Sequence, residues 1–212
     1  MSRILFFILL AGILSQTHQP AYAQELKTFT PDQMLEVENT NITGITNDGR
    51  FAAVTSSSQR DRLGIDHFKF ADPTYVQQRK SRLYVLNTES GERNEVTDGP
   101  TVIQASAWSP DNRTLAVILM DKQRVTLHMY DAERNRLREF KPKTDLEIAS
   151  NTDLNWMPDG TGLMLSLRVD GWRAKADSMY TSTNDGPVVI QESDKDFLAW
   201  DRVWMQNDQS VL

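Results

Sequence analysis

Short apolar runs alternate with polar turns along most of this chain. One combined pattern, a polar turn that carries an aspartate and leads into an apolar run, occurs three times. Its copies are Thr46–Val54, Trp108–Val117 and Trp156–Leu165, and a fourth begins at Trp204. Proline, aspartate, asparagine and glycine each favour a sharp reversal of the backbone. Each copy therefore predicts a tight turn followed by a β-strand. The aspartates of these turns are Asp48, Asp111 and Asp159, and we expect them to have a structural role in the turn.

A second strand–turn–strand pattern follows each copy. The expected strands are Leu83–Leu86 and Arg93–Thr97 after the first, Val125–Tyr130 and Leu137–Phe140 after the second, and Ser178–Thr181 and Val188–Ile190 after the third. With the hairpin of the turn itself, each repeat holds two hairpins. Four strands per repeat are typical of one blade of a propeller.

The spacing of the repeats indicates the architecture. Successive aspartates at 48, 111, 159 and 208 are 63, 48 and 49 residues apart. A period of about 40–50 residues built from short strands is typical of a propeller array. We therefore expect an all-β fold, a partial β-propeller with blades of four antiparallel strands and about three to four blades present. Trp108 and Trp156 end strands and are expected to fill the space between blades.

The first 23 residues have the pattern of a signal peptide. Arg3 precedes the apolar run Ile4–Leu14, and Ala21 and Ala23 form an A-x-A cleavage site. The apolar run is too short for a stable membrane span. The protein is therefore expected to be exported, to a bacterial periplasm or outside the cell. The absence of cysteine fits a bacterial envelope better than a eukaryotic secretory route.

Residues 24–212 are expected to form an incomplete N-terminal β-propeller domain. At 48–49 residues per blade they hold fewer than four blades, whereas closed propellers have four to eight. An open stack would leave an unpaired face at its end. We therefore expect the chain to be the N-terminal part of a longer protein; a short propeller that closes by oligomerisation is the alternative.

Composition narrows the function. The net charge of −6 argues against a nucleic-acid partner, which needs a basic surface. No histidine, aspartate and glutamate set has metal-ligand spacing, and no phosphate-binding glycine loop or Gly-x-Ser-x-Gly motif occurs. The sequence therefore predicts no metal site, no cofactor and no catalytic residue. The acidic cluster Asp194, Asp196 and Asp201 is interpreted as solvated.

Two features lie outside the repeat. Thr30–Gln33 reads as a capping box that opens a short helix through Leu35. The first repeat interval contains an insertion between residues 56 and 80 with charged side chains beside Phe68, Phe70 and Tyr75. Long loops between blade strands are often functional. A docking or substrate-facing role is one interpretation of this insertion, and a passive surface loop is the other.

Several of these segments together resemble the N-terminal propeller of the prolyl oligopeptidase family of serine peptidases, close to its exported dipeptidyl- and acylaminoacyl-peptidase-like members. They are Ser109–Asn112, Met157–Gly160, Leu83–Leu86, Leu127–Asp131, Asp61–Phe68 and Asp72–Tyr75. The resemblance implies a propeller that caps a hydrolase domain with a Ser/Asp/His triad and admits short or unfolded peptide substrates. That domain is absent from this chain, so the chain alone is expected to be inactive. The Glu-Glu pair of dipeptidyl members is absent too.

The repeat motif is shared with TolB-like propellers. The alternative function is therefore a TolB-like periplasmic propeller that serves as a protein-interaction scaffold. A Gly-x-Ser-x-Gly motif downstream would favour the peptidase, whereas further blades alone would favour the scaffold.

Overall fold

The computed structural model describes residues 28–63, 79–121, 124–184, 202, 205, 206 and 208–211. The chain divides into two compact units, residues 1–31 and 32–212. Of the first unit the structure describes residues 28–31, among which Phe29 is exposed. The short helix expected from the capping box is confirmed as α2 (Pro31–Leu35).

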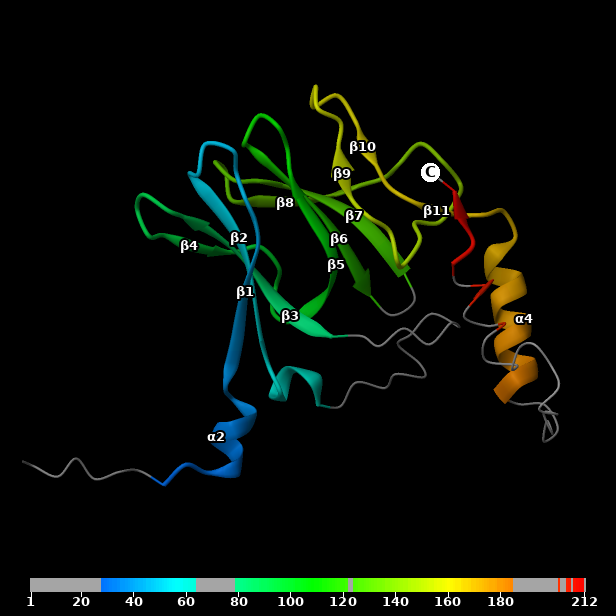
Figure 1. The fold of residues 1–212 in the computed structure, drawn as a ribbon, viewed down its shortest axis with the longest axis horizontal. Coiled ribbons are helices and arrows are strands. Elements are labelled where there is room, and N and C mark those ends of the chain that lie inside the picture. Colours follow the sequence, from blue (N-terminus) through cyan, green and yellow to red (C-terminus); the bar gives the residue numbers. More distant parts are fainter. Residues whose placement is uncertain are drawn as a thin grey trace, which may run out of the picture. The chain divides into compact units, whose positions relative to one another are not determined.

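One eight-stranded antiparallel sheet, made of two consecutive four-stranded blades, forms the greater part of the described second unit (Figure 1). Blade 1 consists of β1 (Glu38–Ile45), β2 (Phe51–Ser58), β3 (Lys80–Asn87) and β4 (Arg93–Glu95). Blade 2 consists of β5 (Thr101–Trp108), β6 (Thr114–Asp121), β7 (Arg124–Asp131) and β8 (Arg136–Phe140). Each strand pairs with the next in sequence, so each blade is an up-and-down meander. A short 3-10 helix, η1 (Arg60–Arg62), follows β2.

The alternation of side chains in blade 2 places apolar groups on both of its faces. Leu115 and Val117 of β6 lie in one core cluster with Leu83 and Val85 of blade 1. Ala116 and Ile118, the alternate residues of the same strand, lie in a second cluster with the segment that follows blade 2. Because successive side chains of a strand point to opposite faces, one apolar strand can serve two neighbours. Blade 2 is therefore packed between blade 1 and the third repeat.

The two blades are also joined by backbone pairing at one end. Lys80 and Ser81 at the start of β3 pair with Val102 and Thr101 at the start of β5. Beyond this two-residue contact the strands pair only within their own blades, as far as the described residues show. Packing of side chains, rather than a continuous hydrogen-bond ladder, therefore supplies most of the contact between the blades.

The third repeat is less regular than the first two. It contains the two-stranded pair β9 (Asn155–Trp156) and β10 (Leu163–Met164), and a second pair of β11 (Leu167–Arg168) with β12 (Ser210–Val211). The prediction of a strand at Ser178–Thr181 is wrong, because these residues lie within helix α4 (Trp172–Asn184). The other expected strand of this repeat, at 188–190, falls outside the described residues.

The physical reason for α4 lies in its first turns. Trp172 and Ala176 lie one helical turn apart, and only 2% and 1% of their surfaces are exposed. The indole N–H of Trp172 donates to the carbonyl of Gln206 at 2.7 Å, and the Arg168 guanidinium lies 3.7 Å from the ring centroid. Alanine, arginine and lysine, which make up this turn, are strong helix formers. Burial at a helical spacing thus outweighs the alternation that we interpreted as a strand.

The fold class expected from the sequence is confirmed. The described part of the chain is mostly antiparallel strand, with few helices and open sheets, and two successive four-stranded blades are followed by a partial third repeat. The chain is all-β, with the architecture of a partial propeller.

Candidate functional site

The three repeat turns have the same hydrogen-bond pattern. Oδ1 of Asp48, Asp111 and Asp159 accepts the backbone N–H two residues further on, at 3.1, 3.2 and 3.0 Å. In each copy the backbone N–H two residues before the aspartate donates to the carbonyl three residues after it, at 2.8–2.9 Å. These bonds satisfy polar groups that strand pairing leaves unused at a hairpin end.

The residue after each aspartate has a left-handed backbone. Gly49, Asn112 and Gly160 have φ of 73°, 63° and 72°. Glycine reaches this conformation without steric cost, and asparagine is one of the few other residues that adopt it. The asparagine adds a contact, because its Oδ1 accepts the backbone N–H of Asn47 in the neighbouring turn at 2.8 Å. The turns of blades 1 and 2 are therefore bonded to each other.

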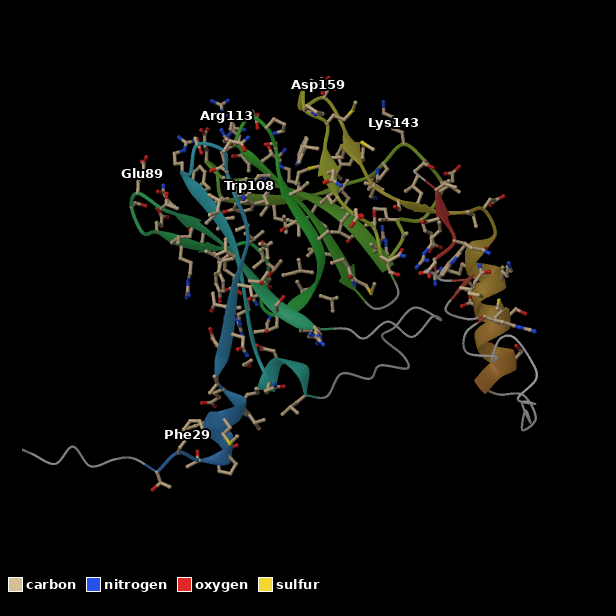
Figure 2. All side chains as sticks on the ribbon, in the orientation of Figure 1. Phe29, Glu89, Trp108, Arg113, Lys143 and Asp159 are labelled. Atoms are coloured by element: carbon tan, nitrogen blue, oxygen red, sulfur yellow. The ribbon has the colours of Figure 1, made fainter. Side chains whose placement is uncertain are left out.

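Hydrogen bonding holds the pKa of each turn aspartate below its ordinary value. For Asp48 and Asp111 the largest cause is the hydroxyl of Thr46 and of Ser109, respectively. For Asp159 it is the backbone N–H of Thr161. In Figure 2, Arg113 and Asp159 mark the turns of blade 2 and the third repeat, which lie along the same edge of the unit. These carboxylates are bonded within their own turns, which is the geometry of a structural role.

Apart from the repeat turns, the molecule has a polar surface along the first strand of each blade, β1 and β5. A cavity of about 780 Å³ runs along β1, β5 and the segment that leads into β9. We call this surface the inner wall. Its polar lining side chains come mainly from these first strands and from β2: Asn39, Asn41, Thr43, Thr55, Ser57, Gln104, Ser106, Thr152 and Asn155.

Strand register explains why these groups gather. Asn39 and Asn41 are alternate residues of β1 and face the same side, directly across from Ser57 and Thr55 of β2. The Ser106 hydroxyl of β5 donates to the Thr43 hydroxyl of β1 at 3.2 Å. The inner wall is thus continuous from blade 1 to blade 2.

Two irregularities of pairing turn side chains toward this cavity. The register of β1 with β2 shifts between Ile42 and Gly44, and that of β5 with β6 shifts between Ile103 and Ala105. The skipped residues, Thr43 and Gln104, both line the cavity. Bulges of this kind re-aim side chains and are common beside functional sites. The inner wall therefore presents amide and hydroxyl groups to the cavity.

Few of the residues that line the inner wall are charged. Among the described residues that line the cavity, the charged ones are Arg79, Lys80 and Asp153. Arg79 and Lys80 lie where β3 meets β5, whereas Asp153 lies in the segment before β9. The lining is otherwise mostly uncharged and hydrogen-bonding.

A second cavity, of about 670 Å³, is apolar. It lies between blade 2 and the third repeat and is lined by groups such as Met129, Trp156 and Leu163. Phe140 and Met164 in its lining are about half exposed. In the described residues the third repeat supplies only short strand pairs against this face. We assign the apolar lining to packing between repeats, and the inner wall is the candidate functional site.

Sequence reasoning did not identify the inner wall. The available signal was the alternation of polar residues at 39, 41 and 43 before the first turn. The residues that it did single out for export or docking, namely Ala21, Ala23, Phe68, Phe70 and Tyr75, lie outside the described residues. In the part of the chain that the structure describes, there is no cluster of three or more histidine, aspartate or glutamate side chains that could hold a metal ion. No helix in that part has the length and hydropathy needed to cross a membrane.

Scans against protein-family models and against curated protein sequences find no match. Solved structures that are similar include TolB from Acinetobacter baumannii, at 14% identity over 63% of this chain with a TM-score of 0.43. Others are a protein from a structural and mechanistic analysis of two prolyl endopeptidases (16%, 65%, TM-score 0.43) and the AtxE2 isopeptidase in its apo form (18%, 75%, TM-score 0.46). The chain spans 28%, 19% and 26% of the length of these proteins, respectively.

Proposed function

We propose that this chain is the N-terminal propeller portion of an exported serine peptidase, which caps a catalytic domain outside the chain and receives its peptide substrates. The observation that carries the proposal is the inner wall, a cavity of about 780 Å³ lined mainly by amide and hydroxyl side chains of the first strands. The resemblance of Ser109–Asn112 and Met157–Gly160 to peptidase propellers supports the same function.

The chemistry of the inner wall suits a peptide backbone. An extended peptide presents N–H and C=O groups with a two-residue period of about 6.6 Å, which is also the spacing of alternate side chains on a strand. Asn39 and Asn41 lie along β1 at this spacing, and Thr43 follows them at the bulge. Asparagine donates and accepts hydrogen bonds, and a hydroxyl does the same. A peptide lying beside β1 would therefore meet a partner at each repeat of its own backbone.

The inner wall would select by size and conformation more than by sequence. Its uncharged groups bond to backbone atoms that every peptide shares. A folded protein has already paired most of its backbone groups and would gain little from such a surface. This is the selectivity expected of a propeller that admits short or unfolded peptides to a peptidase. Bond cleavage would require a serine nucleophile and a histidine base on the catalytic domain.

Peptide binding to this chain tests the proposal. A fluorescent, unstructured peptide without charged residues and with both ends capped would be titrated by anisotropy against the chain. We expect saturable binding that weakens about tenfold or more in N41L/Q104L, because leucine removes amide partners and leaves buried peptide groups unpaired. Asn94→Leu on β4, outside the cavity, is the matched control and should bind as the native chain does. Absence of binding to the native chain would refute the proposal.

A second experiment addresses the peptidase itself. A fluorophosphonate probe should label the protein encoded by the complete reading frame at one serine, and should leave the 212-residue chain unlabelled. A complete protein that is not labelled and does not bind peptides would instead favour the TolB-like scaffold.

A further inference from the structure

The charged residues of the inner wall are unevenly placed. Arg79 immediately precedes β3 and Lys80 is the first residue of that strand, and both line the cavity. The backbone pairing of Lys80 with Val102 fixes this point to the start of β5, at the junction of the two blades. Asp153 is the charged lining residue of the third repeat. The cavity therefore has a cationic part on blade 1 and an acidic residue on a different element.

This arrangement stands out against the charge of the whole chain. The protein carries a net charge of −6, so its average surface repels anions. Two adjacent cations lie in a concave, otherwise mostly uncharged wall, and a cleft concentrates the field of the charges that line it. Amide and hydroxyl neighbours such as Gln104 and Ser81 add hydrogen-bond donors. Together these groups suit the recognition of a carboxylate.

We propose that Arg79 and Lys80 form a carboxylate subsite of the inner wall, so that peptides carrying a free carboxylate bind in preference to neutral ones. The inference rests on the proposed peptide-binding function and adds the substrate class. The carboxylate is either the C-terminus of a peptide or the side chain of an aspartate or glutamate. In each case the arginine supplies a planar set of donors and the lysine a compact charge.

Four peptides of one length and core sequence separate the alternatives. The first is capped at both ends, the second has a free C-terminal carboxylate, the third is capped and contains one glutamate, and the fourth is capped and contains one lysine. On the native chain we expect at least one acidic peptide to bind about fivefold to tenfold more tightly than the capped neutral peptide, and the lysine peptide to gain nothing. The acidic peptide that gains identifies the source of the carboxylate.

Charge-neutral variants locate the effect. R79Q/K80Q should lose the preference for the acidic peptide, because it removes both positive charges from the lining. K141Q/K143Q removes the same charge from exposed positions after β8 that do not line this cavity, and should keep the preference. Asp153→Asn should strengthen acidic-peptide binding, because it removes a negative charge from the same cavity.

Each outcome bears on a different statement. Equal affinity of the neutral and acidic peptides for the native chain would overturn the carboxylate subsite and leave the proposed function standing. Loss of the preference in K141Q/K143Q as well would overturn the subsite in favour of a general charge effect. Binding of no peptide would overturn both proposals. If R79Q/K80Q does not fold, the salt dependence of the native chain decides, because the preference for the acidic peptide should disappear in high salt and a preference that persists contradicts the subsite.

Discussion

The indole N–H of Trp156 donates to the backbone carbonyl of Ala107 at 2.9 Å, and this bond connects the third repeat to blade 2. An equivalent bond connects blade 2 to blade 1, because the indole N–H of Trp108 donates to the backbone carbonyl of Gly44 at 3.4 Å. Ala107 and Gly44 occupy equivalent positions, four residues before the aspartate of their own turns. Each tryptophan thus bonds to the first strand of the preceding repeat, and its ring lies at the contact between the two.

The first prediction concerns this bond. Trp156→Phe keeps an aromatic ring and removes the donor, so we expect a loss of about 1 kcal/mol in the free energy of unfolding. Trp156→Ala also removes the ring from the apolar cluster that includes Ala116 and Ile118 and should cost about 3 kcal/mol. Equilibrium urea unfolding measures both. Met157→Ala, at an exposed neighbouring position, is the control, and a Trp156→Phe variant as stable as the native chain would contradict the prediction.

The second prediction concerns the left-handed residue of the second turn. Asn112 has φ of 63° and bonds through its side chain to the N–H of Asn47. Asn112→Gly loses the bond and relieves the backbone, so its cost should stay within about 1 kcal/mol. Asn112→Ala loses the bond and retains a Cβ in the left-handed region, which adds about 1–2 kcal/mol. The order of stability in urea should be native, glycine, alanine; equal stability of the two variants would show that the backbone conformation is not maintained.

The third prediction concerns acid pH. The pKa of Asp111 is lowered in the fold, with the Ser109 hydroxyl as the largest cause. A group whose pKa is lower in the folded state stabilises the fold above its unfolded pKa, and this stabilisation is lost as the pH falls through the folded pKa. Asp111→Asn should therefore be less stable than the native chain near neutral pH, and the difference should shrink at a pH below the ordinary aspartate pKa of about 3.9, as the pH falls toward the folded pKa. Urea unfolding at the two pH values measures it; a difference that persists in acid would assign the loss to the turn geometry instead of the charge.

The turns could be predicted from sequence because their chemistry is local. Asp48, Asp111 and Asp159 each bond to a backbone group two residues away, so a short segment contains all the information. The strands on either side follow from the same segments, and the four-stranded blades follow from their order.

Helix α4 could not be predicted in the same way. Its first residue, Trp172, is buried against Arg168 and donates to the carbonyl of Gln206, which is 34 residues away in sequence. A pattern read along Ser178–Thr181 contains no trace of that contact. The inner wall was missed for a related reason. Ordinary polar side chains such as Asn41 and Gln104 come together only when separate repeats place them around one cavity.

The fourth prediction concerns export. The A-x-A pattern at Ala21 and Ala23 predicts that signal peptidase removes residues 1–23, so that the mature protein begins at Gln24. N-terminal sequencing of the protein recovered from a bacterial envelope fraction would test this. Substituting Ala23 with a bulky residue such as leucine should block processing and leave the precursor, since the cleavage site requires small residues. A mature chain that starts at Met1 would contradict the prediction.

The fifth prediction concerns His128, which lies across from Glu139 in the pairing of β7 with β8. Burial lowers the pKa of His128, and the charge of Glu139 opposes this only in part. The unfolded chain therefore binds a proton at a higher pH than the folded chain does. The contribution of neutral His128 to the free energy of unfolding should be fully present above about pH 6.5. It should decrease as the pH falls below that value toward the folded pKa.

Two variants test the origin of this slope. His128→Gln should flatten the dependence of unfolding free energy on pH in this window, because it removes the titrating group. Glu139→Gln should steepen it, because the carboxylate that favours the protonated imidazole is lost. The aspartate effect of the repeat turns occurs at lower pH, so the two windows are separable. Urea unfolding measured at half-unit intervals of pH would resolve them, and a slope that is unchanged in His128→Gln would assign the titration to another group.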